Sequence, residues 1–324
     1  MAFFGIRFDL RDPSGDGAAR TARYAAALDM AEWADRHGFA IVTLSEHHGS
    51  PDGYLPSPLT FAAAVAARTQ RIALYVAAVI APLHDPLRLA EDAAVVDLLA
   101  GGRLHVVLAN GYVPEELAMF DVAPGERAAR TEEAVRVLQH AFTGEPFEHR
   151  GRTVRVTPPP SRPGRPALLL GGSSDAAARR AARLGIGYQP STEASWPAYR
   201  TACVDAGRAD PGPYLGGDRT VTILAEDPDA AWEELGPHLL HDATAYGSWA
   251  ALGQVDSGYR PVTTLDDVRA SGQYRILTPD ALLEDLAAAG PLGFALFHPL
   301  VGGAPPELGW RTLELLGHEV LPRL

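Results

Sequence analysis

The sequence has 324 residues, of which 47% are hydrophobic and 21% are charged, so it can bury a large core in two ordinary domains or in one large α/β barrel. Its formal net charge of −12, with no dense basic run, repels phosphate backbones, which argues against a nucleic-acid partner and favours a small-molecule ligand. Cys203 is the only cysteine, which excludes an internal disulfide and a multi-cysteine metal site.

No segment of the sequence has the pattern of an export signal or of a membrane span. The opening stretch, MAFFGIRFDLRDPSG, lacks the basic region and the long apolar segment of a signal peptide. No apolar run approaches the roughly 20 residues that a membrane helix needs. Because a single cysteine also suits a reducing compartment, we expect a cytoplasmic protein that does not contact a membrane.

The first third of the chain alternates short apolar runs with longer amphipathic ones. Residues 3–8, FFGIRF, predict a strand, and residues 19–38 predict a helix with an alanine-rich face that ends at a glycine. The alternation continues with a strand at 39–44, a helix at 58–70, a strand at 72–82, a helix at 86–102 and a strand at 103–111. This pattern is typical of βα units whose parallel strands are buried on both faces.

Four further strands are predicted in the rest of the chain, at 166–172, 185–191, 219–227 and 291–300. Eight parallel strands in about this length favour a (β/α)8 TIM barrel over a six-stranded doubly wound sheet. No GxGxxG follows the first strand, which weakens a dinucleotide-binding interpretation. Residues 143–166, with the pattern of a hairpin and a proline-rich connector, and residues 253–280 are expected to be insertions at the barrel's ends. We therefore expect one domain over residues 1–324.

Polar residues follow directly after several predicted strands. In a barrel these residues lie at the C-terminal face, where active sites are built. The most prominent segment is TLSEHHGSPDGYLPSPL, in which Glu46, His47 and His48 follow an apolar run. Three adjacent titratable groups there are costly to bury without partners, so they form either a site or an exposed corner. The other segments at this face are HDP, ANGYVPEEL, GGSSDAAARRAARLG and QPSTEAS.

These segments, in this order and at these intervals, resemble the bacterial luciferase-like family of flavin-dependent monooxygenases. The likeness rests on SEHHG, on PLHDPLRLAEDAAVVDLLAGGRLHVVLANGYVPEEL and on GGSSDAAARRAARLGIGY, and it spans nearly the whole chain. The resemblance implies a TIM barrel that uses reduced FMN or a reduced deazaflavin coenzyme, commonly as a homodimer. Some members of the family activate oxygen, and others only transfer hydride.

His47 matches the first histidine of the family motif, which the resemblance places beside the flavin ring as a catalytic residue. A neutral imidazole near pH 7 can give or take the proton that oxygen reduction requires. The alternative is a histidine that only caps the second strand. Since neighbouring strand residues point in opposite directions, Glu46 is expected to lie deeper and to support the site, and the role of His48 stays open. A zinc or iron site on these three residues is a sharper alternative, but consecutive side chains diverge and seldom share one metal.

Gly171, Gly172, Ser173 and Ser174 leave the fifth predicted strand and enter a helix. Backbone N–H groups and hydroxyls at such a helix start can hold a phosphate, which the resemblance identifies as the flavin phosphate. The alternative is an ordinary glycine turn followed by a serine cap.

Asn110 and Gly111 end the fourth predicted strand and are also predicted to bind the cofactor, because Gly111 permits close approach of a ligand. Many relatives carry an arginine at or near Asn110 or Val113, which this sequence lacks. Ala109 replaces the cysteine that luciferase itself has, so light emission is not inferred.

The run YVAAVIAP matches the third-strand bulge of the family, where a cis peptide bond without proline lies under the flavin ring. By this resemblance the bond joins Ala77 and Ala78, which are therefore predicted to contact the cofactor. The alternative is an ordinary buried strand of small residues. Six aromatic residues are candidates for a substrate pocket, namely Tyr54, Tyr112, Tyr188, Trp196, Trp249 and Tyr274.

The leading hypothesis is a monooxygenase that oxidises a small organic substrate with oxygen and with reduced FMN from a separate flavin reductase, because no second nucleotide-binding motif is visible. The nearest alternative is a deazaflavin-dependent hydride-transfer enzyme. A flavin-binding relative without catalysis, favoured by the missing arginine, and a metal-dependent barrel hydrolase are the remaining alternatives.

Overall fold

Nine parallel strands form one sheet in the part of the chain that the structure describes. This computed structural model describes residues 2–214, 216, 220–255 and 258–324. The strands are β1 (Phe3–Phe8), β2 (Ile41–Leu44), β3 (Ala73–Ile80), β4 (Leu104–Ala109), β7 (Ala167–Gly172), β8 (Gly187–Pro190), β9 (Val221–Leu224), β10 (Tyr274–Leu277) and β11 (Phe294–Phe297). Their hydrogen-bonded order is β10-β9-β11-β1-β2-β3-β4-β7-β8, and each neighbouring pair is parallel. The parallel α/β architecture predicted from the sequence is confirmed.

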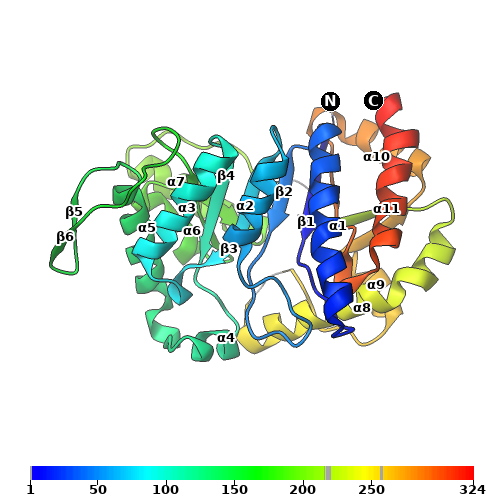
Figure 1. Cartoon of the computed structure of the whole chain (residues 1–324), viewed down its shortest axis with the longest axis horizontal. Coiled ribbons are helices and arrows are strands. Elements are labelled where there is room, and N and C mark those ends of the chain that lie inside the picture. Colours follow the sequence, from blue (N-terminus) through cyan, green and yellow to red (C-terminus); the bar gives the residue numbers. More distant parts are fainter. Residues whose placement is uncertain (1, 215, 217–219, 256–257) are drawn as a thin grey trace.

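Helices follow most of these strands and cover the outer face of the sheet (Figure 1). They are α1 (Gly17–Arg36), α2 (Pro58–Arg68), α3 (Pro86–Ala100), α4 (Pro114–Met119), α5 (Arg127–Ala141), α6 (Asp175–Leu184), α7 (Trp196–Asp205), α8 (Pro228–Gly253), α9 (Leu265–Ser271), α10 (Pro279–Ala289) and α11 (Pro306–Leu315). Of the helices in these described ranges, none combines the length and the hydrophobicity that a bilayer-crossing segment needs.

The local sequence explains where α3 begins and ends. Asp85 caps its start by accepting hydrogen bonds from the N–H groups of Leu87 and Arg88, at 3.0 and 3.2 Å, and Pro86 occupies the first helical position. Gly101 ends it with a φ of 61°, a left-handed conformation that glycine adopts without strain. The HDP motif that follows β3 is thus a helix start at the C-terminal face.

The structure corrects the strand count and one of the two predicted insertions. β5 (Phe147–His149) and β6 (Arg152–Val154) form the antiparallel hairpin predicted within residues 143–166. Residues 253–280, in contrast, contain α9 and the ninth strand, β10, which pairs with β9. The sequence hides β10 because Arg275 interrupts its apolar residues and polar residues flank it on both sides. The first residue of the strand predicted at 219–227 lies outside the described residues, and the prediction of a single domain over 1–324 stays a prediction.

Side chains of the strands alternate between the inner face of the sheet and the helices. A Cβ atom at Gly5 of β1 would lie 2.9 Å from Phe294 Cζ and 3.1 Å from Ile41 Cγ1, so this position faces inward across β11 and β2. Arg7, two residues later, faces the same way. Ile6 and Phe8 point outward and are fully buried. The inward positions of β2 and β3 keep partial exposure, so the inner face is less tightly filled than the layer between strands and helices.

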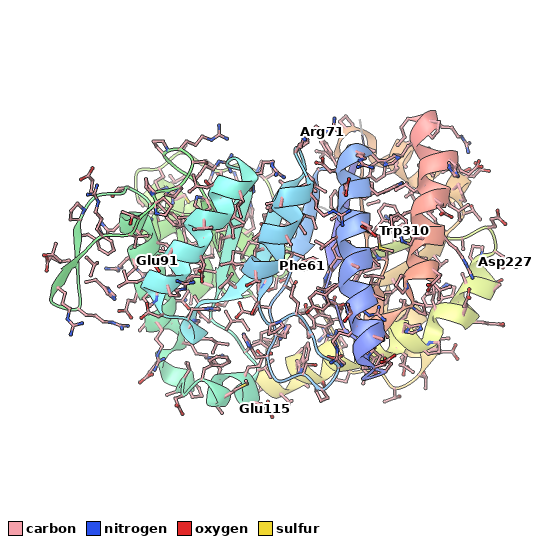
Figure 2. All side chains as sticks on the ribbon, in the orientation of Figure 1. Phe61, Arg71, Glu91, Glu115, Asp227 and Trp310 are labelled. Atoms are coloured by element: carbon pink, nitrogen blue, oxygen red, sulfur yellow. The ribbon has the colours of Figure 1, made fainter. Side chains whose placement is uncertain are left out.

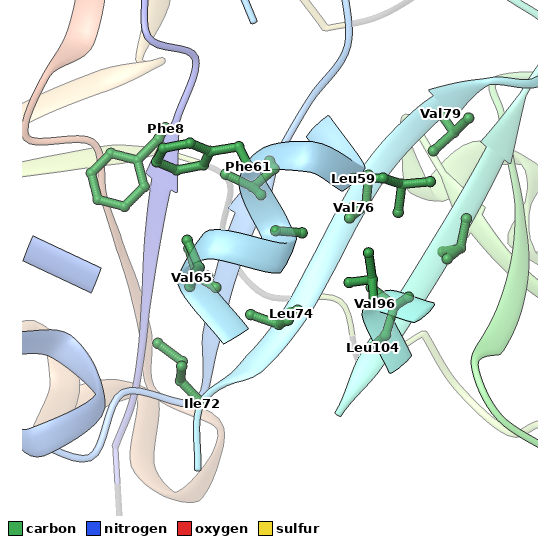
Figure 3. Close-up of a cluster of buried hydrophobic side chains, with 14 of the residues drawn as sticks. Phe8, Leu59, Phe61, Val65, Ile72, Leu74, Val76, Val79, Val96 and Leu104 are labelled. Atoms are coloured by element: carbon green, nitrogen blue, oxygen red, sulfur yellow. The ribbon is translucent and has the colours of Figure 1, made fainter. Parts of the chain in front are cut away.

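That outer layer contains the hydrophobic core. Figure 3 shows Leu74 and Val76 of β3 beside Val65 of α2 and Val96 of α3. Each fully buried aliphatic side chain of this kind stabilises the fold by about 1.5–3 kcal/mol. The outer layer therefore fixes the strands in place. The inward-facing residues at the carboxyl ends of the strands are not needed for this core and are available for a functional site.

The carboxyl ends of the strands meet at one end of the molecule, which α8 crosses. In Figure 1, α4 and α8 lie along the lower edge, and both ends of the chain lie at the top. Figure 2 shows the same direction, with Glu115 of α4, which follows β4, at the lower edge and Arg71, which precedes β3, at the upper edge. The polar segments named above gather at this lower face.

Candidate active site

The end of β2 sends three successive side chains to different places. The hydroxyl of Ser45 donates to the carbonyl of Ala77, at 2.9 Å. Glu46 turns outward and is 2% exposed, whereas His47, 7% exposed, turns back toward α4 and α8. The predicted divergence of Glu46 and His47 is confirmed.

Glu46 is the centre of a buried hydrogen-bonded cluster. Its Oε1 lies 2.6 Å from His48 Nε2 and 2.8 Å from His84 Nε2, and its Oε2 accepts from the N–H of Ile80 at 2.9 Å. Burial, the largest influence, raises the pKa of Glu46, but the hydrogen bonds of both histidines and of Ile80 lower it overall. The carboxylate therefore stays ionised and ties β2 to the end of β3. This geometry gives His48, whose role the sequence left open, a place as a partner of Glu46.

Replacing Glu46 by glutamine is expected to lower the free energy of unfolding by about 1–3 kcal/mol, because His48, His84 and the Ile80 N–H lose a charged acceptor. Since the folded pKa of Glu46 is lowered, its contribution is present above its ordinary pKa and disappears as the pH falls. Urea unfolding at pH 7 and at pH 4 measures this. Glu91→Gln, at a surface position beside Arg88, is the control and should change little. An unaltered unfolding curve for Glu46→Gln at pH 7 would contradict a supporting role.

His47 pairs with a buried glutamate that the sequence analysis does not single out. His47 Nδ1 lies 2.7 Å from Oε1 of Glu116, which begins α4 and also accepts from the N–H of His48 at 3.0 Å. An ionised carboxylate only accepts, so Nδ1 is the donor in this pair and Nε2 is the ring nitrogen left for another partner. No hydrogen-bond partner for Nε2 occurs among the described residues. This histidine is thus oriented for proton exchange at Nε2.

Aromatic rings enclose the His47 imidazole. Trp249 of α8 stacks on it at 4.2 Å between ring centroids, with an interplanar angle of 22°. Tyr54, Tyr112 and Tyr246 meet it edge-on at 4.8, 5.9 and 6.0 Å. Three of the six predicted pocket residues therefore gather around His47, together with Tyr246, which the sequence analysis missed. We call these four side chains the aromatic box.

A buried arginine, Arg11, packs against three rings of the aromatic box. The Arg11 guanidinium carbon lies 4.8 Å from the ring centroid of Tyr54, 4.9 Å from that of Tyr246 and 4.8 Å from that of Trp249. Arg11 is fully buried. The same three rings contact His47, so the position of His47 depends on Arg11.

Three carboxylates hold the charge of Arg11. Its nearest distances are 2.8 Å to Asp52, 3.2 Å to Asp9 and 3.6 Å to Asp242 of α8. Burial, the largest influence, raises the pKa of Asp9 and of Asp52. The opposing effects of His298 on Asp9, of His241 on Asp52 and of Arg11 on both hold each pKa well below its ordinary value. This cluster fastens α8 across the C-terminal face.

The remaining predicted pocket aromatics lie elsewhere. Tyr188 Oη lies 2.8 Å from Ser195 Oγ, and Trp196 donates to the carbonyl of Gly212 at 3.0 Å. Tyr274 donates to Asp242 at 2.6 Å. These contacts place Tyr188 and Trp196 beside α7 and make Tyr274 a partner of the Arg11 cluster.

Small residues form the inner end of β3, β4 and β7. The peptide bond between Ala77 and Ala78 is cis, as the resemblance predicted, and it lies where the register of β3 shifts against β4. A Cβ atom at Gly171 would lie 3.1 Å from Val107 Cγ1 and 3.5 Å from Ala109 Cβ. Ala77, Ala109 and Gly171 therefore make a floor without large side chains, which we call the small-residue floor.

Asn110 and Gly111 lie at the edge of this floor. The Oδ1 atom of Asn110 is buried and has no hydrogen-bond partner in the described structure. Gly111 has a φ of 70°, and a Cβ there would lie 2.7 Å from Ile80 Cγ2. Arg127 at the start of α5 donates to the Gly111 carbonyl at 2.9 Å. An arginine from α5 thus reaches the residue next to Asn110.

The glycine-serine segment begins α6 as predicted. Ser174 is the N-cap residue, and its hydroxyl accepts from the N–H of Ala177 at 3.3 Å. A Cβ at Gly172 would lie 2.6 Å from Ala177 Cβ, so only glycine fits beside this helix start. Ser173 is half-buried and precedes the cap. The structure shows the ordinary cap, and a phosphate role for Ser173 and Ser174 stays a prediction.

The proposed metal triad does not converge. His47 turns to Glu116, whereas Glu46 gathers His48 with His84. Within the described ranges, no group of three histidine, cysteine or acidic residues has an arrangement that suits a metal ion.

The sequence shows similarity to one protein family over most of its length. A family model described as luciferase-like monooxygenase matches residues 4–291. The 4-hydroxyprotoasukamycin monooxygenase of Streptomyces nodosus subsp. asukaensis is 34% identical over 118 residues, 36% of this chain and 32% of that protein. An F420-dependent glucose-6-phosphate dehydrogenase of Nakamurella multipartita is 26% identical over 321 residues, 91% of each. The first four curated relatives are matched over only 30–42% of their own length.

Solved structures show the same fold. The monooxygenase RslO1 from Streptomyces bottropensis matches with a TM-score of 0.76 and 28% identity over 99% of each chain. The oxygenating constituent of 3,6-diketocamphane monooxygenase from Pseudomonas putida, solved with FMN, matches with a TM-score of 0.70 and 18% identity over 100% of this chain and 99% of that one. The predicted fold class, that of the luciferase-like TIM-barrel monooxygenases, is confirmed, although no pairing of β10 with β8 closes the sheet in the described residues.

Proposed function

Since the chain belongs to the luciferase-like monooxygenase family, we propose that it is an oxygenase that uses reduced FMN from a separate flavin reductase to oxidise a small organic substrate with molecular oxygen. The observation that carries this proposal is that the small-residue floor and a histidine oriented by a carboxylate, Glu116, lie at the same face of the sheet. His47 acts there as a catalytic residue, and Glu46 supports the site.

The residues present fit a flavin. The three residues of the small-residue floor have no side-chain atom beyond Cβ that would obstruct a planar ring system, and the unpartnered Asn110 Oδ1 lies at its edge as a hydrogen-bond acceptor. The N–H groups at the start of α6, with Ser173 and Ser174, suit a phosphate. Arg127 adds a cation near Gly111. Ala77, Ala78, Asn110, Gly111, Gly171, Gly172, Ser173 and Ser174 are the residues we assign to this cofactor.

His47 and its neighbours supply proton transfer and shielding. Bound reduced FMN supplies the electrons with which oxygen is reduced. His47 accepts a proton at Nε2, or donates it from the protonated imidazole, while the Glu116 carboxylate stabilises the positive charge at Nδ1. The aromatic box excludes water from the imidazole.

A deazaflavin-dependent hydride transfer is the second candidate. It is favoured by the similarity to the F420-dependent dehydrogenase, which extends over 91% of both chains. Anaerobic titration of the purified protein with reduced FMN and with reduced F420 separates the two candidates. Tighter binding of reduced FMN, followed by substrate-dependent oxygen uptake, supports the oxygenase. Exclusive binding of F420 supports hydride transfer, and binding of neither overturns both.

Ser173→Ala is expected to weaken binding of reduced FMN by about 1–3 kcal/mol, because a hydroxyl that bonds the phosphate dianion is lost. Ser174→Ala should add to this effect, but it also removes the N-cap of α6, at a cost of about 1 kcal/mol in stability. Isothermal titration calorimetry measures the affinity for reduced FMN, and thermal unfolding measures the stability lost with the N-cap. Ser271→Ala on α9 is the matched control. Wild-type affinity in the double variant would place the phosphate elsewhere.

We expect a homodimer, as is common in the family. The outer side of α3 exposes Val95, Leu98 and Leu99 by 45, 43 and 52%, which is an apolar stripe that a second copy would cover. Leu98→Glu with Leu99→Glu is expected to convert dimer to monomer in analytical ultracentrifugation. Leu292→Glu, at a residue that is 68% exposed elsewhere, is the control. A wild-type monomer at micromolar concentration would refute the expectation.

A further inference from the structure

Arg7 is a partly buried cation whose hydrogen bonds go to phenols. Its Nη2 donates to the hydroxyl of Tyr246, and its Nη1 donates to that of Tyr259 at 3.4 Å. Its Nε atom is buried without a hydrogen-bond partner. No carboxylate of the described residues lies within ion-pair distance of Arg7, whereas Arg11, four residues later, contacts three.

Holding the Arg7 guanidinium in this place costs free energy unless an anion binds to it. A guanidinium stays protonated at neutral pH, and burying a cation without a hydrogen-bonded anion is unfavourable. Asp9 and Asp242 pair with Arg11. They act on Arg7 only through space, because no hydrogen bond or ion pair among the described residues joins either carboxylate to Arg7. Tyrosine hydroxyls do not neutralise the charge of Arg7, but they can donate hydrogen bonds to the same anion.

Arg7 also lies next to the proposed reaction site. It is the last inward-facing residue of β1, and its guanidinium carbon is 5.2 Å from the Tyr246 ring. Tyr246 borders His47 at 6.0 Å, and its hydroxyl lies 2.6 Å from that of Tyr54. The ring of Tyr259 stacks on Tyr246 at 4.5 Å with an interplanar angle of 20°. One side of the aromatic box therefore carries a positive charge and phenol hydroxyls.

We propose that Arg7, with the hydroxyls of Tyr246 and Tyr259, binds an anionic oxygen of the organic substrate, which is therefore a planar aromatic acid, either a carboxylate or an ionised phenol. The proposal rests on the proposed function, because it concerns the substrate of the same site. The rings of the aromatic box bind the apolar part of the acid, and Arg7 fixes the orientation of its charged end. Neutral compounds of the same shape leave Arg7 without an anion and bind more weakly.

The test compares charged and neutral aromatic probes, of which 2-naphthoate and 2-naphthamide have the same shape. Binding of 2-naphthoate, 2-naphthamide, 2-naphthol and 4-nitrophenolate to the full chain at pH 8 is measured by calorimetry, with and without FMN. 2-Naphthoate is expected to bind at least about tenfold more tightly than 2-naphthamide, since a hydrogen-bonded charge pair forms only with the acid. A preference for 4-nitrophenolate over 2-naphthol, stronger than that for the carboxylate, would assign the subsite to phenolates.

Variants of Arg7 test whether this residue produces the preference for the acid over the amide. In Arg7→Gln the preference for naphthoate over naphthamide should fall below about twofold, in Arg7→Lys part of it should remain, and Arg68→Gln at the surface should keep it in full. Flavin affinity and the melting temperature of Arg7→Gln should stay near those of the wild type. Equal wild-type affinity for the acid and the amide, no saturable binding of either, or an undiminished preference in Arg7→Gln would each overturn the proposal. So would joint loss of flavin binding and stability, because Arg7 would then only balance the Arg11 cluster. Absence of flavin binding in the wild type, with the acid preference intact, would overturn the proposed function alone.

Discussion

His47→Ala is expected to lower turnover about a hundredfold or more, while the fold and the flavin affinity stay nearly unchanged. In the proposed function, proton transfer takes place at Nε2 of the His47 ring that Glu116 orients, and removal of such a group typically costs 10²–10⁴-fold in rate. The measurement is the rate at which oxygen consumes protein-bound reduced FMN in the presence of substrate, followed by stopped-flow absorbance.

Two variants make the His47 result specific. Glu116→Gln keeps the shape of the side chain but removes the charged acceptor that orients the His47 ring, so it should lower turnover less than His47→Ala does. Glu46→Gln should leave the rate per folded molecule close to wild type. If His47→Ala turns over at the wild-type rate while Glu46→Gln is inactive, the roles of the two residues are reversed.

Arg11→Met is expected to lower the free energy of unfolding by about 3–5 kcal/mol, which is the usual effect of removing one partner from a buried ion cluster. Asp9, Asp52 and Asp242 then stay buried without their shared cation, and α8 loses its fastening to β1. Chemical denaturation at pH 7 measures the loss. Arg68→Met, which breaks only exposed pairs with Asp29 and Glu32, should cost less than about 1 kcal/mol and is the control.

The pH dependence of stability gives an independent test of the Arg11 cluster. The folded pKa values of Asp9 and Asp52 lie below their ordinary values, so their contribution is present above about pH 4. It is lost as the pH falls toward the folded pKa values. Arg11→Met should show a shallower loss than the wild type over this range. Parallel curves for both proteins would show that Arg11 does not hold these carboxylates.

The sequence predicts the parts of the site that depend on neighbouring residues. Strand alternation is enough to separate Glu46 from His47, because successive strand side chains point to opposite faces. The helix start at Ser174 follows from local residue preference. The cis bond between Ala77 and Ala78 could be predicted only through the resemblance, since two alanines in an apolar strand carry no local signal for it.

The sequence does not predict the features of the site that depend on contacts between residues far apart in the chain. Glu116 is 69 positions from His47 in the chain, and the segment ANGYVPEEL has no feature that marks it as a partner. Arg7 and Arg11 lie in FFGIRFDLRD, where arginine and aspartate resemble ordinary surface charges until β1 and α8 are brought together. Arg127 is missed for the same reason, because it contacts Gly111 from a later helix. β10 is missed because Arg275 lies within its short apolar run and polar residues flank it, so the segment has the pattern of a loop.

The most direct test of the account is a crystal structure of this protein with FMN bound. We expect the ring system of the flavin against the Ala77–Ala78 bond, with its phosphate at Ser173 and the start of α6, and with His47 still paired to Glu116. A flavin bound away from the C-terminal face, or one whose ring lies remote from His47, would contradict the proposed site.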